Sequence, residues 1–181
     1  MESAGQIRQP RFIADQNVGK LAKWLRMMGY DTSFFDGVDD SQMVAVALSS
    51  SRVILTRDTS IMRRRVVTTG QLKAILITSD RPETQVKQVI ETLRLDCHFR
   101  AFTICLECNQ ALDARTKEQV RNLVPPYVFK TQKEYVECPA CHRIYWRGTH
   151  WAAMKKKLDT VLQDCQQSGE SVQQQEEKKR Q

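Results

Sequence analysis

Short apolar runs alternate with segments of helical period along residues 11–100. Four of these runs are rich in β-branched and aromatic residues, as strands are. They are Arg11–Ala14, Tyr30–Phe35, Arg52–Thr56 and Lys73–Thr78. Strands that alternate with helices are typical of a parallel sheet with helices packed on its faces. The pattern therefore predicts an α/β fold for this part of the chain.

Between these runs, apolar residues recur every three or four positions, which is the period of an amphipathic helix. The predicted helices are Asn17–Met28, Ser41–Ser50 and Glu83–Leu93. Asn17 is a candidate N-cap of the first helix, and Gly29 is a candidate residue for its end. The pattern over Thr59–Thr69 fits a short helix and a loop equally well.

The pattern changes after residue 100, where two Cys-x-x-Cys pairs appear. Between the pairs the sequence predicts a helix over Arg115–Val124 and a strand near Tyr127–Phe129. The last sixteen residues, QQSGESVQQQEEKKRQ, are polar and biased in composition, so we expect them to be disordered. The chain is thus predicted to comprise a polar lead (1–10), an α/β domain (11–100), a metal ribbon (101–151), a closing helix (152–165) and a tail (166–181).

Composition narrows the classes of protein to consider. Hydrophobic residues make up 41% of the 181 residues, enough for a core. No run approaches the ~18 consecutive apolar residues of a membrane helix, and the N-terminus lacks the apolar segment of a secretory signal. We therefore expect a cytoplasmic protein, in which the six cysteines serve as metal ligands more readily than as disulfides. The net charge of +7 favours a polyanionic partner.

The two Cys-x-x-Cys pairs are the most specific motif in the chain. Each pair can place two thiolates on a tight turn, and two such turns make a tetrahedral site for Zn²⁺. The four predicted ligands are Cys105, Cys108, Cys138 and Cys141. His142 and His150 are alternative ligands, but four cysteines already complete the shell. A closed shell of four thiolates has no open coordination position, so we expect this zinc to be structural.

An aspartate follows each of the four predicted strands. These residues are Asp15, Asp36, Asp58 and Asp80, at spacings of 21, 22 and 22 residues. Parallel strands all point the same way, so the four carboxylates should emerge at one edge of the sheet, joined there by Asp39 and Asp40. Clustered carboxylates need cations, and their oxygens suit Mg²⁺ or Mn²⁺ and metal-assisted phosphodiester hydrolysis. Taken singly, each aspartate is equally well explained as an N-cap or turn residue.

Basic residues surround these acids. Lys20, Lys23 and Arg26 form a stripe on the polar side of the first predicted helix, and Arg57 directly precedes Asp58. A basic rim around an acidic centre would attract a phosphate backbone. Lysine and arginine on a polar helix face also serve solubility alone, which leaves the stripe a supporting observation.

Aromatic residues gather around the second cysteine pair in the stretch RIYWRGTHW. Tyr145, Trp146 and Trp151 could stack on bases while Arg143 and Arg147 contact phosphates. Alternatively, the two tryptophans pack the ribbon against the sheet, because a small metal domain has little core of its own. We favour packing for both tryptophans.

Several motifs together resemble the mut-seven-type C-terminal RNase family. The stretches FIADQNVGKLAKWLRMMGYDT and DDSQMVAVALSSSRVILTRD, the two cysteine pairs and YWRGTHW carry the resemblance over about residues 11–155. It implies a PIN-like three-layer α/β/α sandwich with a small C-terminal zinc ribbon, divalent-metal-dependent cleavage of RNA, and pairing into a homodimer. The family's acids match Asp15, Asp40 and Asp58, and Asp80 lies where PIN-like domains often carry a further acid. Asp36 and Asp39 have no firm counterpart.

We therefore expect a divalent-metal-dependent ribonuclease. Its predicted catalytic acids are Asp15, Asp40, Asp58 and Asp80, of which the first three hold Mg²⁺ or Mn²⁺. The predicted contacts to the RNA backbone are Lys20, Lys23 and Arg57. The alternative is a non-catalytic RNA-binding module built on the zinc ribbon. A receiver-type phosphoacceptor domain is disfavoured, because such a domain needs an acidic pair where Asp15 is followed by Gln16.

Overall fold

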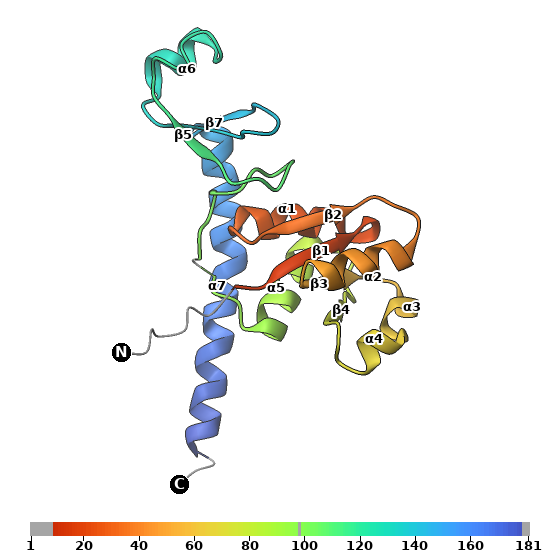
Figure 1. Ribbon diagram of the computed structural model, residues 1–181. Helices are drawn as coiled ribbons and strands as arrows, with labels where there is room; N and C mark the ends of the chain where they lie inside the picture. The colour runs from red at the N-terminus through yellow and green to blue at the C-terminus, as the bar shows by residue number, and fades with distance from the viewer. Residues whose placement is uncertain (1–8, 98, 179–181) are drawn as a thin grey trace, which may run out of the picture.

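The computed structural model of the protein describes residues 9–97 and 99–178 (Figure 1). The sheet region contains β1 (Arg11–Asp15), a 3-10 turn (Gln16–Val18), α1 (Gly19–Met27), β2 (Thr32–Phe35), α2 (Asp40–Ser49), β3 (Arg52–Thr56), α3 (Thr59–Met62), α4 (Arg65–Thr68), β4 (Ala74–Leu76) and α5 (Pro82–Leu93). The remainder contains β5 (Asp113–Arg115), α6 (Pro126–Thr131), β6 (Tyr135–Glu137), β7 (Ile144–Trp146) and α7 (Thr149–Lys178).

A four-stranded parallel sheet in the order β2-β1-β3-β4 forms the centre of the first region. Four of the five residues in β1 and four of the five in β3 are buried. Strands covered on both faces need apolar residues at consecutive positions, and RFIA and RVILT supply them. The predicted α/β fold with a parallel sheet is confirmed.

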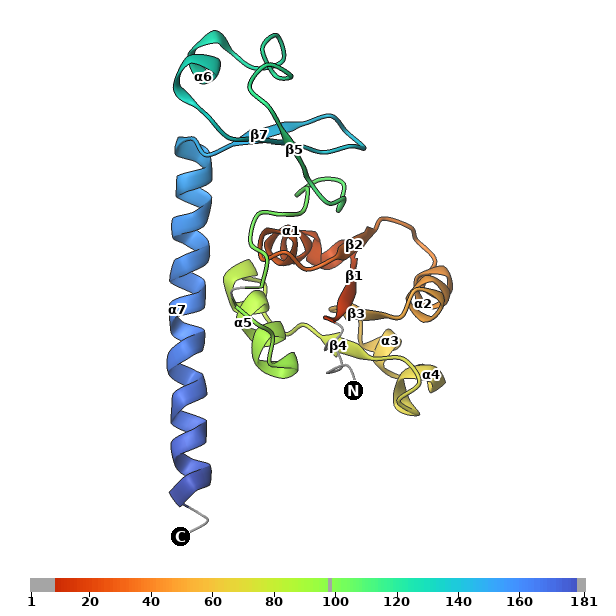
Figure 2. The ribbon, with the colours of Figure 1, turned by 60° about the vertical axis from the view of Figure 1, so that its left-hand side comes forward.

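Helices cover both faces of this sheet. One apolar cluster joins side chains of β1 and β3 to α1, α5 and α7, and a second joins the opposite faces of the same strands to α2 and α3. Figure 2 shows the sheet between these two layers, with α1 and α5 on one side and α2, α3 and α4 on the other. The four strands are parallel, so their carboxyl ends lie at one edge, where open α/β sheets place their sites.

Gly29 ends the first helix, as the sequence predicted. Its φ is +92°, and a Cβ added there would lie 2.3 Å from the carbonyl oxygen of Arg100. Only glycine adopts this conformation at so close an approach without strain. The prediction that Asn17 caps this helix is wrong, because the residue lies inside a 3-10 turn and its side chain makes no capping bond.

The second region is an antiparallel sheet in the order β5-β6-β7. The chain between β5 and β6, residues 116–134, forms an excursion that we call the arm. Two predictions in the arm are wrong: residues 117–123 form successive turns in place of a helix, and α6 replaces the expected strand near Tyr127–Phe129. Pro126 explains the second difference, because proline in the first turn of a helix is favoured and leaves no amide without a partner.

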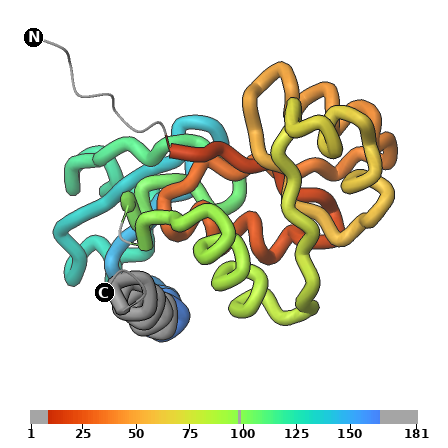
Figure 3. Tube along the Cα trace, turned by 90° about the horizontal axis from the view of Figure 1, so that it is seen from below, coloured from red at the N-terminus to blue at the C-terminus, as the bar shows by residue number. Residues whose placement is uncertain are grey.

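Helix α7 begins directly after β7 and packs beside α5, as Figure 3 shows in a view along its axis. Its residues Leu158, Val161 and Leu162 are buried in the cluster shared with α1 and α5. The backbone of residues 166–178 continues this helix, whereas the sequence predicted disorder there. Glutamine, glutamate and lysine are good helix formers, so polarity alone does not exclude a helix. The predicted lead up to residue 8 and residues 179–181 lie outside the described residues.

Within residues 9–97 and 99–178, none of the helices combines the length and the apolar character needed to cross a membrane.

Candidate metal centre and carboxylate edge

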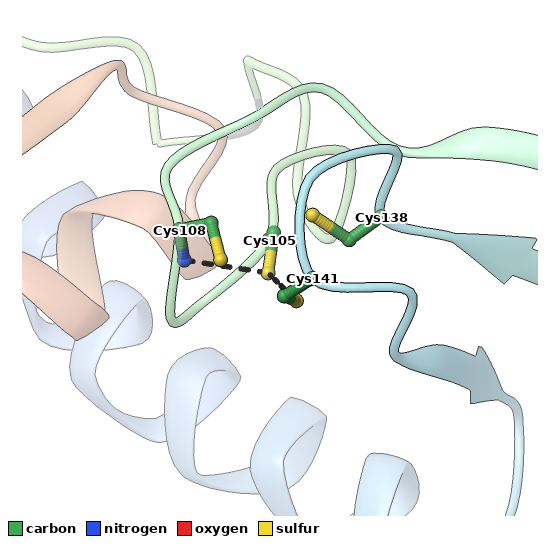
Figure 4. Close-up of side chains that lie close together, drawn as sticks. All are labelled: Cys105, Cys108, Cys138 and Cys141. Carbon is green, nitrogen blue, oxygen red and sulfur yellow. Dashed lines mark hydrogen bonds between the residues drawn. The ribbon is translucent and has the colours of Figure 1, made fainter.

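The four cysteines of the two Cys-x-x-Cys pairs lie together at the start of the ribbon (Figure 4). Their sulfur atoms all lie within 4.8 Å of one another, and the Sγ atoms of Cys105 and Cys141 are 3.8 Å apart. In the described part of the chain, no other group of three or more histidine, cysteine or acidic side chains is so close. Four thiolates at this spacing suit tetrahedral Zn²⁺. The grouping of these four cysteines is confirmed.

The two cysteine turns have the same backbone conformation. In each turn, the amide of the fourth residue after the first cysteine donates to that cysteine's carbonyl: Asn109 to Cys105 at 3.0 Å, and His142 to Cys138 at 2.9 Å. Asn109 and His142 both have a positive φ, +60° and +56°. The ring of His142 contacts Glu137 at 3.0 Å. His142 therefore shapes the turn, and its Nδ1 is engaged away from the sulfur cluster.

The hydroxyl of Tyr145 lies 3.1 Å from Cys105 Sγ and donates to the thiolate. Burial alone would raise the pKa of Cys105, but this hydroxyl and the amides of Cys108 and Glu107 outweigh burial and lower the pKa to about 7. The thiolate is the form that binds a metal. Tyr145 thus supports the cysteine cluster.

The two tryptophans of the ribbon pack against protein. Trp146 joins a small apolar cluster with Val120 and Tyr135, and the ring of Trp151 lies 5.2 Å from that of Phe102. Both tryptophans thus pack, as the sequence favoured, but only Trp151 contacts a residue that packs on the core of the four-stranded sheet, while Trp146 packs within the ribbon.

A network of hydrogen bonds, most of them partly buried, joins the first cysteine turn to the sheet. The guanidinium of Arg26 donates to the carbonyls of Leu106 and the next residue at 2.7 and 2.9 Å, and to Thr32 at 2.8 Å. The side chain of Asn109 accepts from the Thr32 amide at 2.7 Å and donates to Asp31 at 2.5 Å. The cysteine cluster is therefore fixed to α1 and β2.

Asp15 and Asp58 meet at the carboxyl edge of the two central strands. Asp15 is the last residue of β1, and its Oδ2 accepts from the hydroxyl of Thr56 at 2.7 Å and from the side-chain amide of Asn17 at 2.7 Å. The Thr56 hydroxyl also accepts from the Asp58 backbone amide at 3.0 Å. One threonine at the end of β3 thus links the two acids, as the register of adjacent parallel strands allows.

Two of the acids cap helices. Asp58 Oδ1 accepts from the Ser60 amide at 2.7 Å at the start of α3, and Asp39 accepts from Ser41 at 2.8 Å at the start of α2. Donation by Ser60, with the nearby charge of Arg64, lowers the pKa of Asp58 below its usual value. The N-cap alternative therefore describes Asp58 and Asp39, and Asp58 stays charged at neutral pH.

Asp40 and Asp80 each face an arginine. Arg64 lies 3.9 Å from Asp40 and donates to the Ser41 hydroxyl at 3.2 Å. Arg57 forms an ion pair with Asp80. Both acids are therefore paired with cations, and among the described residues the carboxylates of Asp15, Asp40 and Asp58 do not all lie within 4.8 Å of one another. Asp36 is exposed and makes no such contact with the described residues.

The three predicted contacts to RNA have different surroundings. Lys23 forms an ion pair with Glu107 of the ribbon at 2.8 Å, and Arg57 is paired with Asp80. Lys20 is exposed and has no ion-pair partner among residues 9–97 and 99–178. Of the three, Lys20 is the one whose charge is free.

Asn17 and Thr56 belong to this edge, although the sequence did not single them out. Besides holding Asp15, Asn17 accepts from the backbone amide of Arg57 at 3.2 Å. Both are polar residues at or just beyond the end of a strand. The aspartates were identified by the same position in the sequence. Their common role depends on the pairing of β1 with β3, which no local pattern reveals.

Two cavities lie elsewhere on the molecule. One of about 520 Å³ lies between the ribbon sheet and the first turns of α7, and one of about 500 Å³ lies beside Arg26, Asp31 and Asn109. Neither is lined by a strand-end aspartate. The carboxylate edge therefore lies outside both cavities.

The fold and the sulfur cluster define an α/β protein with a four-cysteine ribbon fit for a metal. Residues 10–158 match the family described as the Mut7-C RNAse domain, and because the match spans most of the chain, the protein belongs to this family. The family resemblance noted from the sequence motifs is confirmed. Searches among curated proteins and among solved structures gave no match.

Proposed function

We propose that this protein is a divalent-metal-dependent ribonuclease with a PIN-like α/β/α domain and a structural Zn²⁺ site. Membership of an RNase domain family supports RNA as the substrate. The observation that carries the proposal is the chain of hydrogen bonds from Asp15 through Thr56 to Asp58, at the carboxyl edge of the two central strands.

The free oxygens of these acids fit Mg²⁺ or Mn²⁺. Both hydrogen bonds to Asp15 end on Oδ2, so Oδ1 has no donor among the described residues, and solvent reaches it. Asp58 accepts from the Ser60 amide through Oδ1 and is partly exposed to solvent. Asp40 has only a long 3.9 Å ion pair to Arg64. Hard carboxylate oxygens of this kind are the ligands that these ions prefer.

Each side chain has a distinct task in this proposal. Asp15, Asp40 and Asp58 come together around the ion only when it binds, because their carboxylate oxygens do not all lie within 4.8 Å of one another in the described chain. Thr56 and Asn17 fix the orientation of the Asp15 carboxylate. When bound, the ion supplies Lewis-acid polarisation of the phosphate and a lowered pKa of a bound water.

The basic residues at this edge act on the RNA strand. Lys20 and Arg57 contact its backbone, which brings the scissile phosphate to the acids. Asp80 holds Arg57 in place and adds negative charge. Lys23 contacts RNA only when its ion pair with Glu107 is broken.

Cleavage of a labelled single-stranded RNA with Mn²⁺ tests this function. We expect Asp15→Asn and Asp58→Asn each to reduce the rate by about 100-fold or more, because metal polarisation contributes several kcal/mol to the barrier. Asp36→Asn removes an equal charge from a strand end without these contacts and should cleave like the wild type. Retained cleavage in both Asp15→Asn and Asp58→Asn would refute the mechanism.

A second candidate is a non-catalytic RNA-binding module. The ion pairs of Asp80 with Arg57 and of Asp40 with Arg64 favour it, because they neutralise two of the four acids without a metal. This candidate predicts RNA binding that weakens steeply with salt and no cleavage with Mg²⁺ or Mn²⁺. The same RNA and the same protein preparation therefore distinguish the two functions.

A further inference from the structure

The arm, residues 116–134, lies at one end of the molecule. Figures 1 and 2 show α6 beyond the ribbon sheet, on the side away from the four-stranded sheet. Val120 and Val124 are buried against Tyr135 of β6, with Val128 and Phe129 packed beside them. This small cluster holds the arm as a folded unit that projects from β5 and β6.

The arm carries a net positive charge, with four cations against two glutamates. The cations of the arm are Lys117, Arg121, Lys130 and Lys133. In the described chain, none of them has a carboxylate within ion-pair distance. The other lysine and arginine residues of the ribbon are paired: Arg115 with Glu137 (2.6 Å), Arg143 with Glu107 (3.4 Å) and Arg147 with Glu134 (3.2 Å). In α7, Lys155 pairs with Asp159 (2.6 Å). One of the arm's two glutamates is thus already engaged. The unpaired cations distinguish the arm from the rest of the ribbon.

Two of these cations are held against the same aromatic ring. The Nζ of Lys117 lies 4.9 Å from the centre of the Phe129 ring, and the Cζ of Arg121 lies 5.3 Å from it. Cation–π contact stabilises each charge a little but does not cancel it. Both cations therefore keep their charge available to an anion.

Apolar and aromatic surface accompanies this charge. Tyr127 is 76% exposed and Leu123 is 64% exposed. Lys130 follows Tyr127 by three positions in α6, so the two side chains lie on the same side of the helix. An exposed ring beside free cations is typical of surfaces that bind single-stranded nucleic acid, where bases stack and phosphates meet lysine or arginine. The centres of protein–protein interfaces are instead depleted in lysine.

We propose that the arm is an anchoring surface for single-stranded RNA, separate from the carboxylate edge. Tyr127 stacks on a base, and Lys117, Arg121 and Lys130 contact phosphates. The inference rests on the proposed function in taking RNA as the partner. It adds a second place where the strand is held, so that RNA bound at the arm is kept close to the protein while another stretch reaches the edge.

Fluorescence anisotropy of a labelled single-stranded oligoribonucleotide, without added Mg²⁺ or Mn²⁺, tests the arm in the full chain. Replacing Lys117, Arg121 and Lys130 together by glutamine should weaken binding at least about 10-fold at low salt. It should also make the slope of log affinity against log salt shallower by about 2, for three lost phosphate contacts at ~0.7 each. Tyr127→Ala should weaken binding by about 5- to 150-fold, since stacking one base is worth ~1–3 kcal/mol, while Tyr127→Phe should bind like the wild type.

The matched control replaces Lys155, Lys156 and Lys157 of α7 by glutamine, which removes the same three charges from another exposed surface. It should bind RNA within about 2-fold of the wild type and keep most of the salt slope. Equal weakening by the control and the arm variant would overturn the anchor, because net charge would then explain both. Unchanged zinc content and melting temperature show that each variant is folded.

Cleavage of the same RNA with Mn²⁺, measured in parallel, separates this inference from the proposed function. RNA binding that depends on the arm, without cleavage, supports the anchor and refutes the ribonuclease. Cleavage with arm variants that bind like the wild type refutes the anchor alone, and leaves the arm as a surface for a protein partner. Absence of any RNA binding by the wild type refutes both.

Discussion

The cysteine cluster and the carboxylate edge are both groups of metal-ligating side chains, but they are organised differently. The four cysteines lie on two turns of the same conformation, and their sulfur atoms gather within 4.8 Å. The acids lie at the ends of different strands and helices, and each is engaged by its own amide, hydroxyl or arginine. The first group is formed by local geometry, and the second by the order of strands in a sheet.

This difference has a chemical basis. A thiolate is a weak hydrogen-bond acceptor, so few protein groups compete with a metal for it. A carboxylate accepts readily from amides, hydroxyls and guanidinium groups, and at this edge Ser60, Thr56, Arg57 and Arg64 all take part. A site built from carboxylates can therefore remain open to exchange with substrate and ions, while a four-thiolate site is closed and structural.

The largest effect that separates the two groups should come from Cys138→Ser. Loss of one thiolate opens the zinc shell, so zinc content should fall from about one per chain towards zero. Because metal binding and folding of a small ribbon are coupled, we expect a loss of at least about 3 kcal/mol, or ~6–12 °C in Tm. Metal analysis and thermal melting measure both quantities.

Cys97→Ser is the matched control for Cys138→Ser, because Cys97 lies outside the cluster. It should leave the zinc content unchanged. Full zinc content in Cys138→Ser would show that the ribbon does not need the fourth sulfur. The cysteine cluster could then not be described as a closed site, in contrast to the open carboxylate edge.

Thr56→Val should have an intermediate effect, confined to the carboxylate edge. The change keeps the shape but removes the hydroxyl that donates to Asp15 and accepts from the Asp58 amide. Asp15 Oδ2 would keep only the bond from Asn17, and the part-buried Asp58 amide would lose its acceptor, which should cost about 1–3 kcal/mol, measurable by urea unfolding. Mn²⁺ affinity should fall by about 10- to 100-fold, since the hydroxyl orients a ligand.

Thr56→Ser retains the hydroxyl and should preserve most of both quantities. Normal zinc content in Thr56→Val would show that the two sites are independent. Unchanged Mn²⁺ affinity in that variant would show that the orientation of Asp15 does not matter for the ion, and would contradict its role as a ligand.

The smallest effect should come from Asp31→Asn, at the junction of the two regions. Burial tends to raise the pKa of Asp31, but hydrogen bonds from Arg52 and Asn109 outweigh it and lower the pKa below its ordinary value. The charged carboxylate therefore stabilises the fold above its unfolded pKa of about 3.9, and this contribution is lost as pH falls through the lower folded value. About a third of the side chain is exposed, so we expect about 1 kcal/mol at pH 7.

Unfolding of wild type and Asp31→Asn at pH 7 and near pH 3 measures this effect. The difference in unfolding free energy should shrink at the lower pH. A difference that stays constant would mean that Asp31 supports the junction through packing and not through its charge.

The arm shows where sequence patterns failed and why. The sequence predicted a helix over Arg115–Val124, yet Val120 and Val124 fill a small core against Tyr135 through a series of turns. Tyr127 and Phe129 are typical strand residues, but they follow Pro126 and lie in α6. Tertiary packing and one proline outweighed local preference in a segment too short for either pattern to dominate.

The sequence by itself determined the four central strands, the end of α1 at Gly29 and the four cysteines. Each of these depends on residues close together in the chain, where spacing fixes geometry. Only the tertiary structure decided that Thr56 joins Asp15 to Asp58, that Arg57 and Arg64 face acids, and that the arm's cations remain unpaired. Those relations join residues far apart in the chain, and they depend on which strands become neighbours when the sheet assembles.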